Sequence, residues 1–248
     1  QIGGFCMSMF CYQCQETARG TGCEIMGVCG KKEEVAKLQD LLMDSLKQIS
    51  QIVIRNQLHA TTLTELNREV TNSLFMTITN ANFDEDAIEK KIMKLYTLRD
   101  ELESGQENKA SYIITKEYLG REVMLQKAEL IGVLSTKDED VRSLRELVVY
   151  GLKGMAAYTE HAYNIGLEDM ELYQFFYEAL NAVTDDMKTL EDLIALTLKT
   201  GEFGVKAMAL LDQANTQKYG NPELTKVNIG VKANPAILIS GHDLVDLE

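Results

Sequence analysis

Four cysteines near the start of the chain have the residue type and the spacing that could bind a metal. Cys11, Cys14, Cys23 and Cys29 follow the pattern C-x2-C-x8-C-x5-C, with glycines between them. Glycines permit backbone turns with positive φ and let peptide N–H groups approach inorganic sulfides. On spacing alone an iron–sulfur cluster is favoured, while structural zinc and redox-active thiols or disulfides stay open.

The three histidines are the next candidate ligands. His242 follows the apolar run 236–239 and is expected at a strand-to-helix turn, where open α/β sheets place ligand-binding groups. A simple helix cap in this segment would need no such function. His161 is interpreted as a side chain satisfied inside a helical body. His59 is expected to end a helix, as a structural or exposed residue.

Amphipathic helices are the elements that must position these residues. Apolar residues recur at three- and four-residue steps from Val35 to Ile52, which predicts a helix over about residues 33–58. Similar patterns later in the chain predict an all-α body of about six or seven helices. Gly151 and Gly154 lie inside one of these helices, where glycine is unfavourable. We therefore expect another helix to approach closely there.

The character of the sequence changes past residue 218. Both prolines of the chain lie in this part, together with two β-like runs, Lys226–Val231 and Ala236–Ile239. Strands separated by a turn and followed by a new helix indicate the start of a Rossmann-like α/β domain. The expected fold is therefore mainly α, with a cysteine loop, a helical bundle domain and the start of an α/β domain.

Four parts follow from these patterns. We expect residues 1–8 to lie upstream of a native start at Met9, and the sequence to be a fragment of a longer protein. The expected divisions are residues 9–32 for the iron–sulfur binding loop, 33–217 for the all-α helical domain and 218–248 for the start of a truncated α/β domain.

The composition narrows the function classes. The formal net charge of −13 argues against nucleic-acid binding, which needs clustered Lys and Arg. No run of about eighteen apolar residues predicts a membrane span, and the start lacks the pattern of a signal peptide. We therefore expect a cytoplasmic protein in a reducing compartment, where clustered cysteines are more often metal ligands or catalytic thiols than disulfides.

Four segments carry a resemblance to a known family. In chain order they are MFCYQCQETARGTGCEIMGVCGKKEEVAKLQDLL, TNANFDED, LRELVVYGLKGMAAYTEHA and KYGNPELTKVNIGVKANPAILISGHDLVDLE. In this order they resemble segments of the hybrid cluster proteins, also called prismane proteins, many of which are named hydroxylamine reductases. The resemblance extends from Met9 to Glu248 and matches the N-terminal portion of the family.

The resemblance implies two metal centres. The four cysteines of the loop would bind a 4Fe-4S cluster. His242 matches a histidine that binds a second, hybrid 4Fe-2O-2S cluster, which would make it a catalytic residue. The other ligands of the hybrid cluster match no residue up to Glu248, so the fragment alone is expected to be inactive.

The resemblance also implies an oxidoreductase that reduces hydroxylamine to ammonia and water, or related nitrogen compounds such as nitric oxide, with a link to nitrosative stress. Electrons would come from an external donor protein or reductase, and neither nucleic acid nor membrane would be a partner. The alternative is a non-catalytic helical module that carries structural zinc or a cluster that senses nitrosative stress.

Overall fold

The computed structural model describes residues 8–78, 82–104 and 120–240. This part of the chain is mainly α, which confirms the predicted class. None of its helices has an apolar stretch long enough to cross a membrane. Its α-helices are α1 (Glu33–Arg55), α2 (Thr64–Ile78), α3 (Glu85–Ser104), α4 (Arg121–Ala128), α5 (Glu139–Asn164), α6 (Met170–Ala182) and α7 (Leu190–Tyr219).

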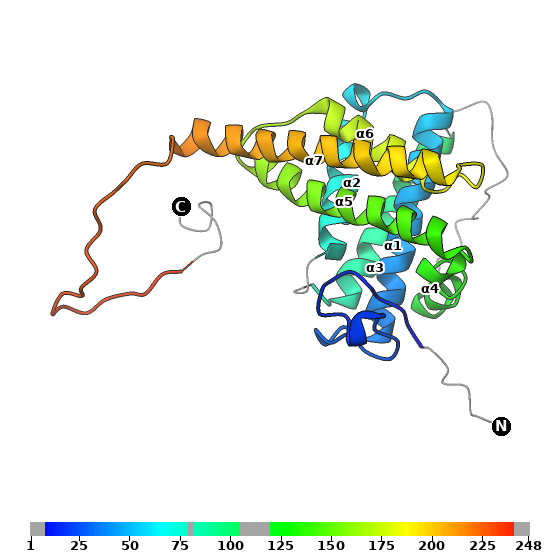
Figure 1. Cartoon of the computed structure of the whole chain (residues 1–248), viewed down its shortest axis with the longest axis horizontal. Coiled ribbons are helices and arrows are strands. Elements are labelled where there is room, and N and C mark those ends of the chain that lie inside the picture. The colour runs from blue at the N-terminus through cyan, green and yellow to red at the C-terminus, as the bar shows by residue number, and fades with distance from the viewer. Residues whose placement is uncertain (1–7, 79–81, 105–119, 241–248) are drawn as a thin grey trace.

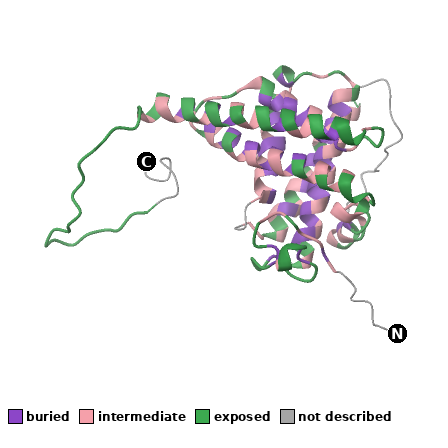
Figure 2. Cartoon of the chain, in the orientation of Figure 1, coloured by how far each residue is buried: buried purple, intermediate pink, exposed green. Residues whose placement is uncertain are grey.

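Helix α1 is the central helix of the bundle (Figure 1). It packs against α3, α4 and α6, and the side chains on its apolar stripe, such as Leu38, Leu42 and Leu46, are fully buried. Figure 2 shows the buried residues concentrated where these helices face one another. Because the cysteine-rich segment joins directly to α1, it is attached to a helix whose apolar stripe is buried in the core.

Helix α5 packs against both α2 and α7. At Gly151 a Cβ atom would lie 2.6 Å from Cγ2 of Thr200 on α7, so the predicted close helix approach is confirmed there. At Gly154 a Cβ atom would meet open space, so the same prediction is wrong for that residue. Helix α6 also packs on α7, through stacked rings of Phe175 and Phe203 whose centroids lie 4.0 Å apart.

The segment after α7 differs from the sequence prediction. Residues 220–240 are exposed and contain no strand, so the strands expected at Lys226–Val231 and Ala236–Ile239, and with them the Rossmann-like start, are not seen (Figure 1). A strand forms when its backbone groups pair with a neighbouring strand. No described segment pairs with these two runs. The domain boundary at 218 stays a prediction, next to the observed end of α7 at Tyr219.

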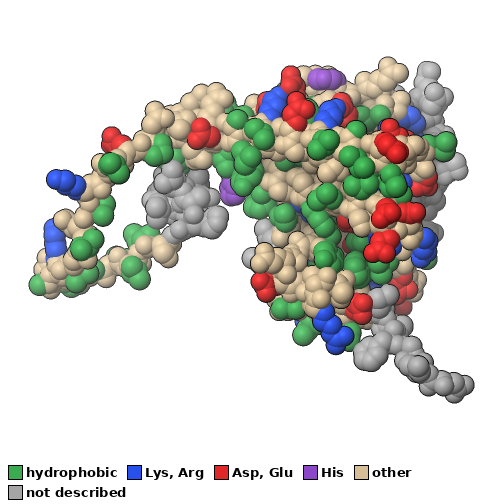
Figure 3. Space-filling view, in the orientation of Figure 1, with side chains coloured by type: hydrophobic (Ala, Val, Ile, Leu, Met, Phe, Trp, Pro, Cys, Tyr) green, Lys and Arg blue, Asp and Glu red, His purple; other side chains and the backbone are tan. Residues whose placement is uncertain are grey.

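One surface of the bundle is unusually apolar. Along α7, exposed hydrophobic side chains recur at helical spacing, and Figure 3 shows apolar side chains gathered on this face. They include Ile194, Leu198, Val205 and Met208. Most isolated exposed apolar residues need no explanation, but a row of them along one helix marks a surface suited to contact with other protein.

Candidate metal centre

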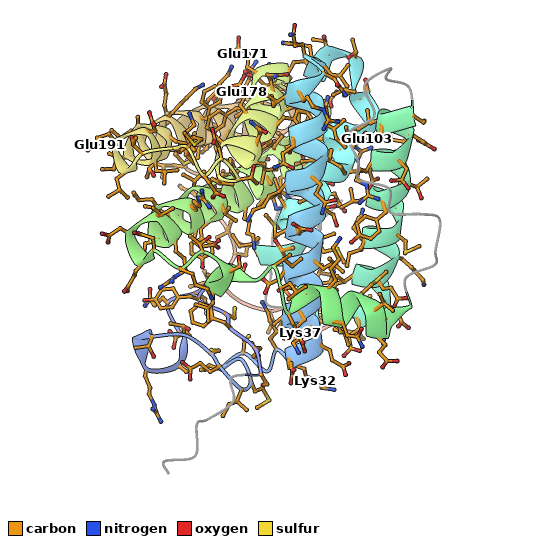
Figure 4. The ribbon with its side chains drawn as sticks, turned by 90° about the vertical axis from the view of Figure 1, so that its right-hand side faces the viewer. Lys32, Lys37, Glu103, Glu171, Glu178 and Glu191 are labelled. Carbon is orange, nitrogen blue, oxygen red and sulfur yellow. The ribbon has the colours of Figure 1, made fainter. Side chains whose placement is uncertain are left out.

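The cysteine loop, Met9–Lys32, folds back on itself beside the start of α1. Cys11 and Cys23 form an isolated antiparallel bridge, in which N–H of each donates to C=O of the other at 3.0 and 2.9 Å. Between them the chain reverses through Arg19, Gly20 and Gly22, all with positive φ. In Figure 4, Lys32 and Lys37 mark the end of α1 that the loop adjoins. The predicted use of glycine for such turns is thus confirmed at these two glycines.

Gly22 is the glycine whose replacement should disturb the loop most. Its φ is +131°, and a Cβ atom would lie 2.5 Å from Cε2 of Phe10. We expect Gly22→Ala to lower the free energy of unfolding by about 2 kcal/mol, because a strained backbone and a clash coincide. Chemical denaturation checks this. Gly120→Ala, at a glycine with ordinary φ and open space around it, is the control and should change little. Equal effects of the two changes would contradict the loop geometry.

Cys23 has the most enclosed sulfur of the loop. Its side chain is buried and accepts a hydrogen bond from the backbone N–H of Ala18 at 3.4 Å, with the Thr17 hydroxyl 3.7 Å away. Burial alone would raise the pKa of the Cys23 thiol. Hydrogen bonds from Ala18, Val28 and Thr17, together with the charge of Lys31, outweigh it and lower the pKa. The surroundings of this sulfur therefore favour the thiolate, which is the form that binds metals.

Cys11 is surrounded by donors of a different kind. The Lys31 ammonium lies 3.8 Å from its sulfur, and the side-chain amide of Gln13 donates to the same sulfur at 3.9 Å. Lys31 also donates to Oε1 of Gln39 at 2.7 Å, and Lys153 of α5 donates to Oε1 of Gln13 at 2.8 Å. Two lysines thus approach one cysteine, one directly and one through an amide.

The remaining cysteines are more open than Cys23. Cys14 is half-buried and Cys29 is exposed, and all four loop cysteines are free thiols. Within the described ranges no group of three or more His, Cys, Asp or Glu side chains lies close enough together to hold a metal ion. The structure therefore brings Cys11 and Cys23 together through their backbones but does not gather the four sulfurs, and the four-cysteine ligand set stays a prediction. His242 lies outside the described residues.

The donor chemistry of the loop nevertheless fits an iron–sulfur group. Its thiols are free, and backbone, hydroxyl, amide and ammonium donors are directed at two of the sulfurs. Behind Lys31, the buried Nε2 of Gln39 has no acceptor among the described residues. Buried N–H groups rarely lack a partner, and inorganic sulfide is an acceptor of the kind that hydrogen bonds tune in such clusters.

The other two histidines lie within the described residues. The prediction that His59 ends a helix is wrong, because α1 ends at Arg55. His59 instead caps the short 3-10 helix Ala60–Thr62 by accepting a bond from the N–H of Thr61. His161 lies on α5 with its ring edge-on to Phe75, at 5.5 Å between centroids, in line with a structural role.

A small cavity that sequence reasoning missed lies between the cysteine loop and the helical body. It has a volume of about 50 Å³, and Cys11, Asp40, Glu146, Tyr150 and Lys153 are among the residues that line it. Burial raises the pKa of Asp40 to about 7 and lowers that of Lys153 to about 8. The signal in the sequence was a lysine four residues after the apolar Val149, and therefore on the same face of a predicted helix.

Comparisons with known proteins agree with one another. The model of the Prismane/CO dehydrogenase family matches residues 9–248. The chain is 60% identical over 247 residues to a hydroxylamine reductase of Acetivibrio thermocellus, which covers 98% of this chain and 45% of that protein. It is 50% identical over 250 residues to a hydroxylamine reductase of Clostridium perfringens, covering 98% and 46%. The chain therefore spans less than half the length of these relatives.

Proposed function

The chain belongs to the Prismane/CO dehydrogenase family, and on that basis we propose that it is part of an iron–sulfur oxidoreductase that reduces hydroxylamine to ammonia and water. The relatives named hydroxylamine reductase support this activity. Nitric oxide is a related substrate of the same chemical class. The observation that supports the proposal best is the loop of free thiols, in which the sulfurs of Cys23 and Cys11 accept hydrogen bonds from the Ala18 N–H and the Lys31 ammonium.

In this proposal Cys11, Cys14, Cys23 and Cys29 hold a 4Fe-4S cluster as thiolates. When bound, such a cluster supplies one-electron transfer. The residues around the loop prepare the ligands for it. The Ala18 N–H stabilises negative charge on the sulfur of Cys23, and packing of the loop on α1 keeps that sulfur out of water. Both effects are ways in which a protein tunes the potential of such a group.

The substrate would bind elsewhere. We propose that His242 is one ligand of the hybrid 4Fe-2O-2S cluster and that the other ligands lie in the part of the relatives that this chain does not match. An external donor protein in the cytoplasm would then deliver electrons to the cysteine loop. The helical body, residues 33–217 in the proposed division, would hold the loop in place.

Anaerobic reconstitution with iron and sulfide tests the cluster proposal. We expect about four irons per chain, a brown colour, and an EPR signal that appears on reduction with dithionite. The control is the same chain incubated with zinc alone, since zinc sites are colourless and redox-silent. A chain that takes up zinc but no iron would contradict the proposal and favour the non-catalytic module.

A further inference from the structure

Two buried lysines approach Cys11, one from the end of the cysteine loop and one from α5. Lys31 and Lys153 are only 2% and 3% exposed. Lysine is almost never fully buried unless its charge has a partner. Both ammonium groups are directed towards the same part of the loop, around Cys11.

Lys153 reaches the loop through a single amide. Its Nζ donates to Oε1 of Gln13 at 2.8 Å, and Nε2 of the same amide donates to the sulfur of Cys11 at 3.9 Å. Lys153 lies on α5, 140 residues away in the chain from Gln13. The contact therefore exists only because α5 packs behind the loop. It forms a chain of hydrogen bonds from ammonium to amide to sulfur.

Building on the proposed function, we propose that Lys153, acting through the Gln13 amide, raises the reduction potential of the cluster bound at Cys11. Lys31 adds to this effect by direct contact with the same sulfur. A cation near a redox group favours the reduced state, which carries more negative charge. Water screens such a charge little when it is buried, and one hydrogen bond polarises the next in a chain.

The other charges around Lys153 determine how far it raises the reduction potential of the cluster. Asp40 and Glu146 line the same cavity and oppose the ammonium, while Lys47 and Lys31 act in the same direction as Lys153. The Lys153 ammonium lines the same cavity as the two carboxylates, and it is hydrogen-bonded to the amide that contacts the sulfur of Cys11. Lys153 is a positioning residue for charge at the cluster and does not itself bind iron.

An EPR-monitored redox titration of the reconstituted chain measures this effect. We expect Lys153→Met to bind the same amount of iron as the unmodified chain. Its one-electron equilibrium should shift roughly tenfold towards the oxidised form, which lowers the reduction potential of the cluster by about 59 mV. The titration is done at pH 7, below the pKa of about 8 that burial gives Lys153. Lys199→Met is the matched control, because Lys199 is an exposed lysine on α7, which packs on α5 and α6. Its potential should equal that of the unmodified chain.

A double-mutant cycle separates the path through the amide from a merely structural role. Gln13→Leu should lower the potential in the same direction, and in that background Lys153→Met should have a smaller effect than alone. The proposal would be overturned if the shifts in reduction potential of the two variants were fully additive, or if Lys153→Met left the potential unchanged. If Lys153→Met does not fold, Gln13→Leu decides, since an unchanged potential there overturns the proposal too.

The failure of this proposal and that of the proposed function give different results. An unmodified chain that binds about four irons, with the same potential as Lys153→Met, contradicts only the role of Lys153. An unmodified chain that binds no iron at all contradicts the iron–sulfur function, and the role of Lys153 with it.

Discussion

Replacing Cys23 with serine is expected to reduce iron uptake from about four irons per chain to nearly none. Cys23 is the buried cysteine of the loop and already accepts a hydrogen bond from the Ala18 N–H. A serine hydroxyl is a harder and much weaker ligand for iron than a thiolate. Iron quantitation and visible absorbance after anaerobic reconstitution measure the loss. The brown chromophore should disappear with the iron.

Cys6→Ser is the matched control for this change. Cys6 precedes the loop in the sequence, and the cysteine spacing does not assign it as a ligand. Its replacement should leave iron content and colour unchanged. If Cys23→Ser kept both colour and iron, Cys23 would not be a ligand and the four-cysteine assignment would fail. If both variants lost iron, a role specific to the four-cysteine pattern would be contradicted.

Replacing Asp40 with asparagine is expected to stabilise the fold at pH 8 by about 2 kcal/mol and to have little effect at pH 4. Burial raises the pKa of this carboxyl to about 7, with Glu146 adding to the rise and Lys153 opposing it. Between about pH 4 and pH 7 the folded state therefore holds a proton that the unfolded chain has released. Stability is consequently lost as the pH rises through this window. Asparagine cannot ionise, so the variant does not lose this stability as the pH rises.

The full pKa shift would correspond to a larger gain. We expect only about 2 kcal/mol because the asparagine amide brings N–H donors that are themselves costly to bury without a partner. Urea denaturation at pH 4, 6 and 8 measures the difference. Glu202→Gln, which removes an exposed carboxylate from α7, is the control and should show no such trend. A gain for Asp40→Asn that is equal at all three pH values would contradict the ionisation argument.

Much of the fold could be predicted from local pattern. The apolar residues of α1 recur along one helix face, and the structure buries that same stripe against α3, α4 and α6. The β-like runs after residue 218 show where local pattern is insufficient. Their residue types suit strands, but a strand also needs a partner that accepts its hydrogen bonds. A helix satisfies its backbone within itself, so its prediction is less dependent on the rest of the chain.

The candidate site, like the fold, could be predicted from the sequence only in part. The four thiols, their spacing and the turns that glycine permits lie within one short segment, so the sequence by itself determined the candidate metal ligands of the loop. Only the tertiary structure decided which groups surround Cys11. Gln13 meets Lys153 across 140 residues, and Asp40 shares a cavity with both. The packing of α5 behind the loop creates these contacts, and no local sequence pattern specifies which helix packs there.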